Sequence, residues 1–366
     1  MLSLFRRKLP QPRPQTFNQR VDAFWAWFQT VAPRFYDAIE ARRCSSLTDE
    51  VSGKVDELLP GFAWVFGPGE NGNGHSFTLT GEGIIHRQLL ALHWLSRAPV
   101  VDGWTFYAAR QPGPIKGRVI EIDGVRFDPK EIWVTPHVDG QDENVDLTLW
   151  HPAWGTVDGS IQRNVTFLFL DEALGEYGTD WWIGQIEFGK DQLSGAFPVE
   201  ELAAFVESTA RERGWRKAPP GELWTLYSTK ESSGDFPRAD IITQNTCVPK
   251  LFTDFMNSAG EYDDPLTGTG ADYVYVSIDG SFFPESQEVS RRGEIEDAIE
   301  KVLKGFDGGR CVGGALGRER SYSDFLVFDG ERSLGAIKQV LREQKAPAGT
   351  MIEYFAREKR GQRIAF

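Results

Sequence analysis

Histidine and cysteine are both scarce in this chain, which has five histidines and three cysteines among 366 residues. The cysteines, Cys44, Cys247 and Cys311, are odd in number, far apart and outside any CxxC pattern. This pattern disfavours a disulfide framework and a zinc knuckle. Free thiols are typical of a reducing compartment, so we expect a cytoplasmic protein.

The few histidines also lack the spacing of metal ligands. His86 and His93 lie seven residues apart, whereas zinc-binding pairs on helices are usually four apart. A site would need His75 or His151 to converge with them in space. The acidic run 139–146 lacks the central glycine and final glutamate of a calcium loop and is better interpreted as a hairpin tip. We therefore expect neither a metal nor a cofactor.

Long apolar runs are missing as well. None approaches the length that spans a membrane, so no transmembrane segment is expected. The basic, proline-rich residues 1–16 lack the apolar core of a signal peptide and are interpreted as a lead-in. Their Leu2, Leu4 and Phe5 lie beside three basic residues. A weak peripheral membrane anchor is therefore the alternative interpretation.

Basic residues are fewer than acidic ones: the chain has 40 lysines and arginines and 53 aspartates and glutamates, which gives a net charge of −13. A surface this acidic repels phosphate, which disfavours a general nucleic-acid binder. The charge suits solubility, and it would also suit the capture of a basic partner.

The C-terminal part lacks two residue types altogether. All twelve tryptophans lie at or before Trp224, and all five histidines lie at or before His151. A Pro-Pro-Gly link at 219–221 lies close to this change of composition and is a candidate domain boundary. The predicted parts are the lead-in 1–16, an N-terminal domain 17–217 and a C-terminal domain 222–366.

What the sequence does contain is clearest in residues 59–114. Apolar residues alternate at 62–66 and again at 76–80, and glycine and asparagine fill the residues between them, which predicts a hairpin. Residues 84–97 have the apolar spacing of one helix face, and 104–107 is a third strand. Strand, strand, helix and strand together predict a sheet with a helix on one face.

The rest of the chain favours an α+β fold, with antiparallel or mixed sheets and helices on one face. Asp123-Gly124 between two short apolar runs is a strong hairpin signal. Further strands are predicted at 132–138, 145–150, 165–170 and 181–188, and helices at 17–43, 48–59, 171–177 and 198–213. From residue 272 the order is βαββαβ, and by this order alone the C-terminal part resembles ferredoxin-like modules.

Four short motifs carry a further resemblance. They are WxWF at Trp25–Phe28, Pro60-Gly-Phe with Trp64 and Phe66-Gly-Pro68, Ala98-Pro99 with Gly103–Tyr107, and the junction Leu170–Glu176. Together they make residues 17 to about 207 resemble a widespread bacterial domain of uncharacterised function. This resemblance covers about half of the chain and implies no catalytic residue.

No complete catalytic motif is present. Gly74–Thr78 has the first glycine and the serine of a nucleophile elbow but lacks its final glycine. Asp171, Glu172 and Glu176 follow an apolar run and could hold Mg²⁺ or act as acid and base, although acids in a first helical turn explain them as well. Cys247 would need a histidine base, and every histidine lies in the other predicted domain.

Six residues form the candidate binding face of the N-terminal sheet: Trp64, His75, His86, Trp104, Tyr107 and Arg110. The two tryptophans are expected on strands of one sheet, while His75 and Arg110 lie at strand ends, where loops place polar groups around a concave site. Arg110 could pair with a ligand carboxylate or phosphate, or with one of the chain's own acids, and simple internal pairing is favoured.

These observations favour a non-catalytic binding or interaction protein, and an immunity-type protein that neutralises a basic toxin is one form of it. The partner would be a protein or a small molecule. The alternative is a hydrolase with its site at the domain interface or around His75 and His86. A structural partner subunit is a third interpretation, and the sequence does not indicate an oligomeric state.

Overall fold

The computed structural model describes residues 15–140, 143–216, 218–229, 234–362 and 364–365. The described chain forms two compact units. The C-terminal unit comprises residues 15–30, 56–60 and 224–365, and the central unit comprises residues 31–55 and 61–223. Helix α1 (Phe17–Glu40) runs through both, as does α2 (Thr48–Leu58). The α+β class predicted from the sequence is confirmed.

The first sheet of the central unit confirms the predicted strand, strand, helix and strand order. Strands β1 (Ala63–Pro68) and β2 (His75–Thr80) are antiparallel, and β3 (Trp104–Tyr107) pairs in parallel with β2 after helix α3 (Ile85–Ser96). Aromatic rings pack on one face of this sheet. Phe66 contacts Phe35 of α1 with ring centroids 5.9 Å apart, and Phe77 contacts Trp94 of α3 at 6.0 Å.

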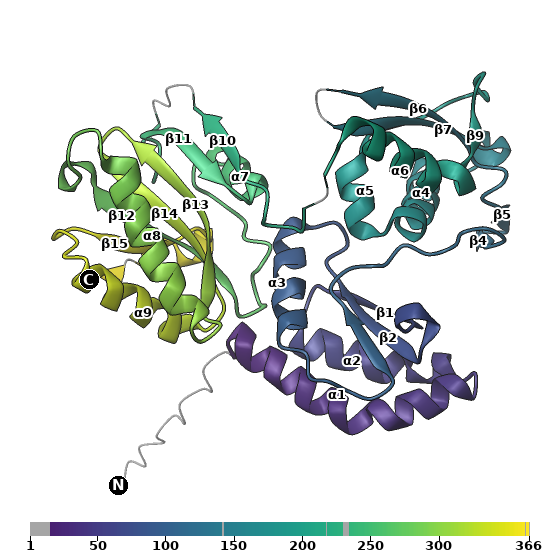
Figure 1. The fold of residues 1–366 in the computed structure, drawn as a ribbon, viewed down its shortest axis with the longest axis horizontal. Coiled ribbons are helices and arrows are strands. Elements are labelled where there is room, and N and C mark those ends of the chain that lie inside the picture. Colours follow the sequence, from purple (N-terminus) through teal and green to yellow (C-terminus); the bar gives the residue numbers. More distant parts are fainter. Residues whose placement is uncertain (1–14, 141–142, 217, 230–233, 363, 366) are drawn as a thin grey trace, which may run out of the picture. The chain divides into compact units, whose positions relative to one another are not determined.

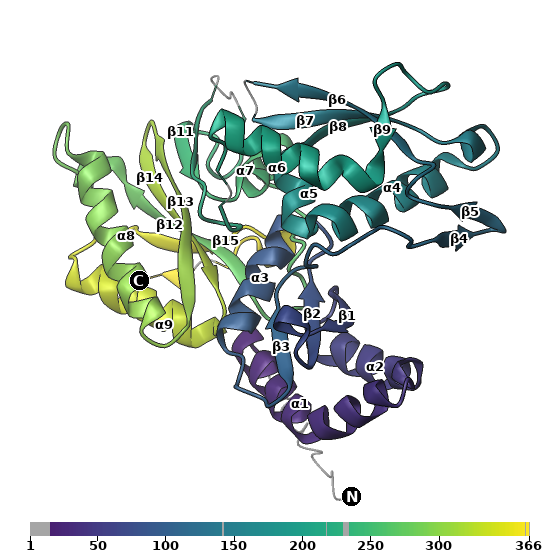
Figure 2. The ribbon, with the colours of Figure 1, turned by 45° about the vertical axis from the view of Figure 1, so that its right-hand side comes forward.

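The second sheet of the central unit has the strand order β8-β7-β6-β9. Its strands are β6 (Trp133–Asp139), β7 (Asn144–Trp150), β8 (Ile183–Phe188) and β9 (Phe197–Pro198). Helices α4 (Gly159–Leu174), α5 (Glu176–Trp182) and α6 (Leu202–Arg213) lie together on one side of it (Figures 1 and 2). The predicted hairpin around Asp123-Gly124 is formed by β4 (Ile120–Ile122) and β5 (Val125–Phe127). The acidic tip is only partly described, because residues 141–142 lie outside the described ranges.

The strand predicted at 165–170 is wrong, because these residues lie inside α4. Asp158 caps the helix by accepting a hydrogen bond from the Ser160 amide (2.8 Å), which is a typical helix start. Val165 and Phe169 are buried four positions apart, whereas Phe167 is 46% exposed. A short continuous apolar run does not distinguish a buried strand from a helix, and here the helical spacing decides it.

The C-terminal unit is built on one antiparallel sheet of seven described strands, in the order β10-β11-β13-β14-β12-β15-β16. The strands are β10 (Thr225–Ser228), β11 (Ile241–Thr246), β12 (Asp272–Asp279), β13 (Gly309–Gly317), β14 (Arg320–Val327), β15 (Met351–Tyr354) and β16 (Ile364–Ala365). The ferredoxin-like interpretation stays a prediction, because β10, β11 and β16 extend the sheet beyond the βαββαβ core.

The two faces of this sheet are covered differently. Helices α8 (Glu288–Lys304) and α9 (Gly330–Glu343) lie side by side on one face, where Val274 and Val276 of β12 join their core (Figures 1 and 2). Alternate strand residues point to opposite faces, so Tyr273 and Tyr275 lie on the other face. Helix α7 (Pro249–Asn257) covers part of that second face. Its Phe255 ring lies 5.1 Å from Phe355.

The first turn of α1 belongs to the C-terminal unit. The Phe17 amide donates to the carbonyl of Gly270 (3.0 Å), and its ring lies 6.2 Å from Phe328. Gly270 has φ +86°, and a Cβ there would lie 2.5 Å from the Gln15 carbonyl oxygen, so only glycine fits this close approach. The predicted boundaries 17–217 and 222–366 stay predictions, and the compact units group residues 15–30 with the C-terminal part.

Limited proteolysis should cut first between about residues 217 and 240, where exposed linkers are expected. The two fragments should then co-elute in native size-exclusion chromatography, because residues 15–30 pack within the C-terminal unit. Denaturing electrophoresis should separate them. First cleavage inside 280–340, or separate elution of the fragments, would contradict this expectation.

Within the described ranges, no helix is both long and apolar enough to cross a membrane. The residues proposed for a peripheral anchor, Leu2, Leu4 and Phe5, lie outside those ranges.

Candidate functional site

The two tryptophans of the predicted binding face do lie in one sheet, Trp64 on β1 and Trp104 on β3. Trp64 stacks on Phe77 with centroids 6.0 Å apart, and its indole N–H donates to the Ser52 hydroxyl (3.2 Å). Trp104 is buried and lies 5.6 Å from Phe66. Packing within the central unit thus accounts for both side chains without a ligand.

His75 lies beside Trp104, with ring centroids 5.9 Å apart. Its Nε2 is 3.0 Å from a Glu40 carboxylate oxygen, and its side chain is 13% exposed. Ser76 is the next strand residue and therefore points to the opposite face, so it is not placed as a nucleophile for this histidine. His86 is buried on α3.

Tyr107 is the last residue of β3, and Arg110 lies in the segment that follows this strand. The Arg110 guanidinium pairs with Glu82 at 2.7 Å, which is the internal pairing favoured from the sequence. Tyr107 is half-buried on β3. Burial, and next the charge of Glu70, raise the pKa of the Tyr107 phenol.

Glu176, one of the acids singled out in the sequence, is a buried acceptor at the start of α5. Its carboxylate accepts hydrogen bonds from the Thr80 hydroxyl (2.5 Å) and the Gln88 amide (3.1 Å). It also accepts from the backbone N–H groups of Gly83 (3.1 Å) and Arg110 (3.3 Å). These contacts tie α5 to β2, α3 and the segment after β3, which indicates a structural role.

Two more acids lie close to Glu176. Burial raises the pKa of Asp171, and it raises the pKa of Asp180 from 3.8 to about 6. Asp171 lies near the end of α4 and not in the first turn of a helix, as was predicted from the sequence. Across the described ranges, the acids, histidines and cysteines include no group of three or more that could hold a metal ion.

The pKa of Asp180 predicts a pH dependence of stability. Because the folded-state pKa lies above the ordinary value of 3.8, the folded protein binds more protons between about pH 4 and 6. The free energy of unfolding should therefore fall as the pH rises through this window. Asp180→Asn keeps an acceptor for Gln88 and should flatten this fall, whereas the exposed Asp191→Asn should not. Urea unfolding at pH 4, 5, 6 and 7 measures the free energy of unfolding. An equal change of this free energy with pH in the wild type and both variants would contradict the prediction.

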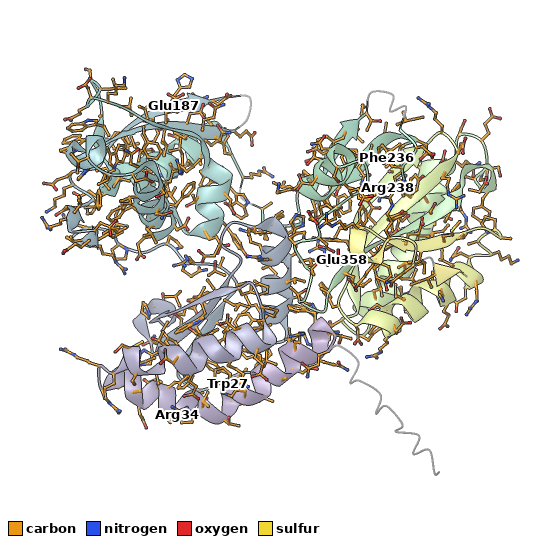
Figure 3. The ribbon with its side chains drawn as sticks, turned by 180° about the vertical axis from the view of Figure 1, so that it is seen from behind. Trp27, Arg34, Glu187, Phe236, Arg238 and Glu358 are labelled. Atoms are coloured by element: carbon orange, nitrogen blue, oxygen red, sulfur yellow. The ribbon has the colours of Figure 1, made fainter. Side chains whose placement is uncertain are left out.

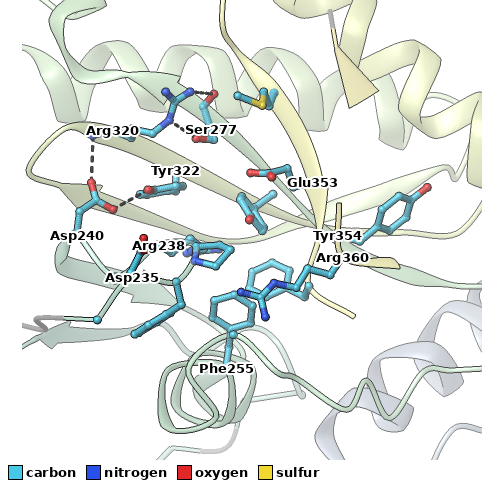
Figure 4. A pocket seen from close by; sticks show the side chains of 18 of the residues that line it. Asp235, Arg238, Asp240, Phe255, Ser277, Arg320, Tyr322, Glu353, Tyr354 and Arg360 are labelled. Carbon is cyan, nitrogen blue, oxygen red and sulfur yellow. Dashed lines mark hydrogen bonds between the residues drawn. The ribbon is translucent and has the colours of Figure 1, made fainter. Parts of the chain in front are cut away.

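An open pocket of about 1170 Å³ lies in the C-terminal unit, on the sheet face opposite α8 and α9 (Figure 4). Sheet residues line one side of it, among them Tyr275, Ser277, Tyr322, Met351 and Glu353. The segment 234–240, which precedes β11 and carries Phe236 and Arg238, lines another side (Figure 3). Phe255 of α7, the turn 318–320, Phe355 and Arg360 also line it.

A buried ion pair lies at the base of this pocket. Arg238 Nη1 and Nη2 contact the two Asp324 oxygens at 2.6 and 3.1 Å, and the two side chains are 1% and 3% exposed. The guanidinium carbon also lies 4.9–5.0 Å from the ring centroids of Tyr275, Tyr322 and Phe355. Because the guanidinium group is planar and delocalised, it can form the bidentate pair with Asp324 and also pack against the faces of the aromatic rings.

Asp240 fixes the C-terminal end of the same segment. Its carboxylate accepts a hydrogen bond from the Tyr322 hydroxyl (2.6 Å) and from the amides of Glu319 and Arg320 (3.2 Å each). Arg238 has φ +67°, a left-handed conformation that a non-glycine residue adopts only when its surroundings enforce it. The pocket wall is thus held at Arg238 and at Asp240 by contacts to the sheet.

This pocket was missed by reasoning from the sequence. The available signal was Asp324, a charged residue directly before the apolar run 325–328, since a buried carboxylate requires a partner. Nothing in the spacing identified Arg238, which lies 86 positions earlier, as that partner.

Comparisons of the chain with protein-family models, with curated proteins and with solved structures found no match. The resemblance of residues 17–207 to an uncharacterised bacterial domain therefore stays a prediction.

Proposed function

We propose that this protein acts by binding rather than by catalysis, and that its ligand occupies the pocket of the C-terminal unit. The observation that carries the proposal is a pocket whose wall is fixed before any ligand arrives, by Arg238 with Asp324 and by Asp240 with Tyr322. Pockets that combine aromatic walls with a few placed polar groups are typical ligand sites. A prearranged wall also lowers the ordering cost of binding.

The hydrolase alternative has less support. His75 contacts Glu40, and the neighbouring Ser76 points to the other face of the strand. An immunity-type role remains a form of the binding proposal, since the net charge of −13 favours a basic partner. The cytoplasmic location expected from the free cysteines is part of the same proposal.

A thermal-shift screen with cell metabolites and short peptides tests the pocket. A ligand that binds only the folded state stabilises it by about 2.7 kcal/mol at a hundredfold excess over Kd, so at least one compound should raise the Tm. Met351→Trp should reduce that shift, because the larger side chain takes up part of the pocket.

Arg110→Ala is the matched control on the face predicted from the sequence. Its own Tm should change little, because a partly exposed ion pair such as that of Arg110 with Glu82 contributes about 0–1 kcal/mol. It should also keep the ligand response. A response that survives Met351→Trp but is lost in Arg110→Ala would reject the pocket and favour the N-terminal sheet.

A further inference from the structure

Arg320 differs in its contacts from other arginines that line the pocket. Arg238 pairs with Asp324, and Arg360 pairs with Glu261. Arg320 instead donates through Nε to the Ser277 hydroxyl, and through Nη2 to the carbonyls of Ser277 (3.0 Å) and Gly349 (2.9 Å). Neutral groups thus hold this guanidinium in place, and these contacts to described residues do not involve Nη1.

The acids near Arg320 have other partners. Asp279 lies opposite it across β12 and β14, and its carboxylate accepts from the Ser281 amide (2.9 Å) and hydroxyl (2.6 Å). These two hydrogen bonds are the largest causes of the lowered pKa of Asp279, to which the charge of Arg320 also contributes. Asp240 accepts from the Arg320 backbone amide and from Tyr322. Within the described ranges, no carboxylate forms an ion pair with the Arg320 guanidinium.

A fixed guanidinium with no carboxylate within ion-pair distance among the described residues is a candidate site for an anion. Its Nη1 keeps N–H donors for a carboxylate oxygen, and a guanidinium that is already held in place loses less freedom on binding than a mobile one. Tyr322, Tyr275 and Phe355 line the same pocket, so an aromatic or apolar body would have rings to pack on. Glu353 points into the pocket from β15 (Figure 4) and would oppose a second negative charge there.

We propose that the pocket binds a ligand with one carboxylate on an aromatic or apolar body, and that Arg320 takes the carboxylate. This inference rests on the proposed binding function and names its ligand class. The volume of about 1170 Å³ is at or above the upper end of small-molecule pockets, roughly 300–1,000 Å³. The carboxylate could therefore belong to a small aromatic acid or to the C-terminal end of a peptide.

The test uses benzoylglycine and its uncharged amide, benzoylglycinamide, on the whole protein. Calorimetry should show saturable binding of the acid, at least tenfold weaker binding of the amide, and at least tenfold weaker binding of the acid to Arg320→Gln. Arg320→Lys keeps the charge and should retain part of the affinity. Arg342→Gln, an exposed change on α9 at the opposite face of the sheet, should bind as the wild type does.

Thermal unfolding without ligand separates binding from folding, because Arg320→Lys and Arg320→Gln should each stay folded at the assay temperature. The peptide Gly-Ala-Ala-Phe with a free C-terminus, compared with its C-terminal amide, distinguishes the two sources of the carboxylate. Tighter binding of this peptide than of benzoylglycine assigns the site to a chain end, and the reverse assigns it to a small acid. Equal binding of acid and amide, an unchanged affinity in Arg320→Gln, or no binding of either carboxylate probe would overturn the inference. The pocket itself would still be judged by the Met351→Trp response.

Discussion

Asp324→Ala should destabilise the protein by about 3–5 kcal/mol, the usual cost of removing one partner of a buried ion pair. The change leaves the Arg238 guanidinium at 1% exposure with no carboxylate. It also removes the acceptor of the Gln244 amide (2.8 Å). Denaturant unfolding followed by near-UV signals should show a lower midpoint with a similar slope.

The double variant Arg238→Met with Asp324→Leu separates an unpaired charge from lost packing. Replacing a buried pair by apolar residues is often close to neutral, so the double variant should recover much of the stability lost in Asp324→Ala. Asp254→Ala is the control, because its partner Lys250 is 63% exposed and such a pair contributes about 0–1 kcal/mol. A loss in Asp324→Ala as small as in Asp254→Ala would show that the buried pair does not hold the pocket wall.

Glu176→Ala should cost at least about 3 kcal/mol, because each buried donor left without an acceptor costs roughly 1–3 kcal/mol. The N–H groups of Gly83 and Arg110 and the side chains of Thr80 and Gln88 all donate to this carboxylate. Hydrogen exchange should show the loss locally, as faster exchange at Gly83 and Arg110.

Glu82→Gln is the matched control for Glu176. Glu82 pairs with the Arg110 guanidinium but is 45% exposed, so its loss should change stability by less than about 1 kcal/mol. Protection of the Gly83 amide should remain as in the wild type. Unchanged protection in Glu176→Ala would refute the role assigned to the buried carboxylate.

Local patterns were enough to predict most of the fold. Alternation at 76–80 and the helical spacing of 84–97 each specify one element. Apolar side chains recur at every second residue in a half-buried strand and at about every 3.6 residues in an amphipathic helix. The apolar run 165–170 was the exception, since nearly every position in it is apolar and the period is hidden. The placement of residues 15–30 against Phe328 was also not predictable, because it depends on contacts between distant parts of the sequence.

The candidate site was predicted less well for the same reason. Trp64 and Trp104 were correctly placed in one sheet. Which face of that sheet is covered depends on the packing of α1 and α3, which the sequence does not show. The pocket combines Arg238, Glu353 and Arg320 from three separate segments. No spacing rule connects them, and only the three-dimensional structure brings them together.

The position of Thr16 and Asp329 in one unit has a consequence for synthesis on the ribosome. Their side chains form a hydrogen bond although they lie 313 positions apart. The ribosome adds about 5–20 residues per second, so roughly 15–60 s pass between the synthesis of Thr16 and that of Asp329. During that interval Phe17 has no Phe328 to contact, so the nascent chain carries an apolar surface that a chaperone would recognise.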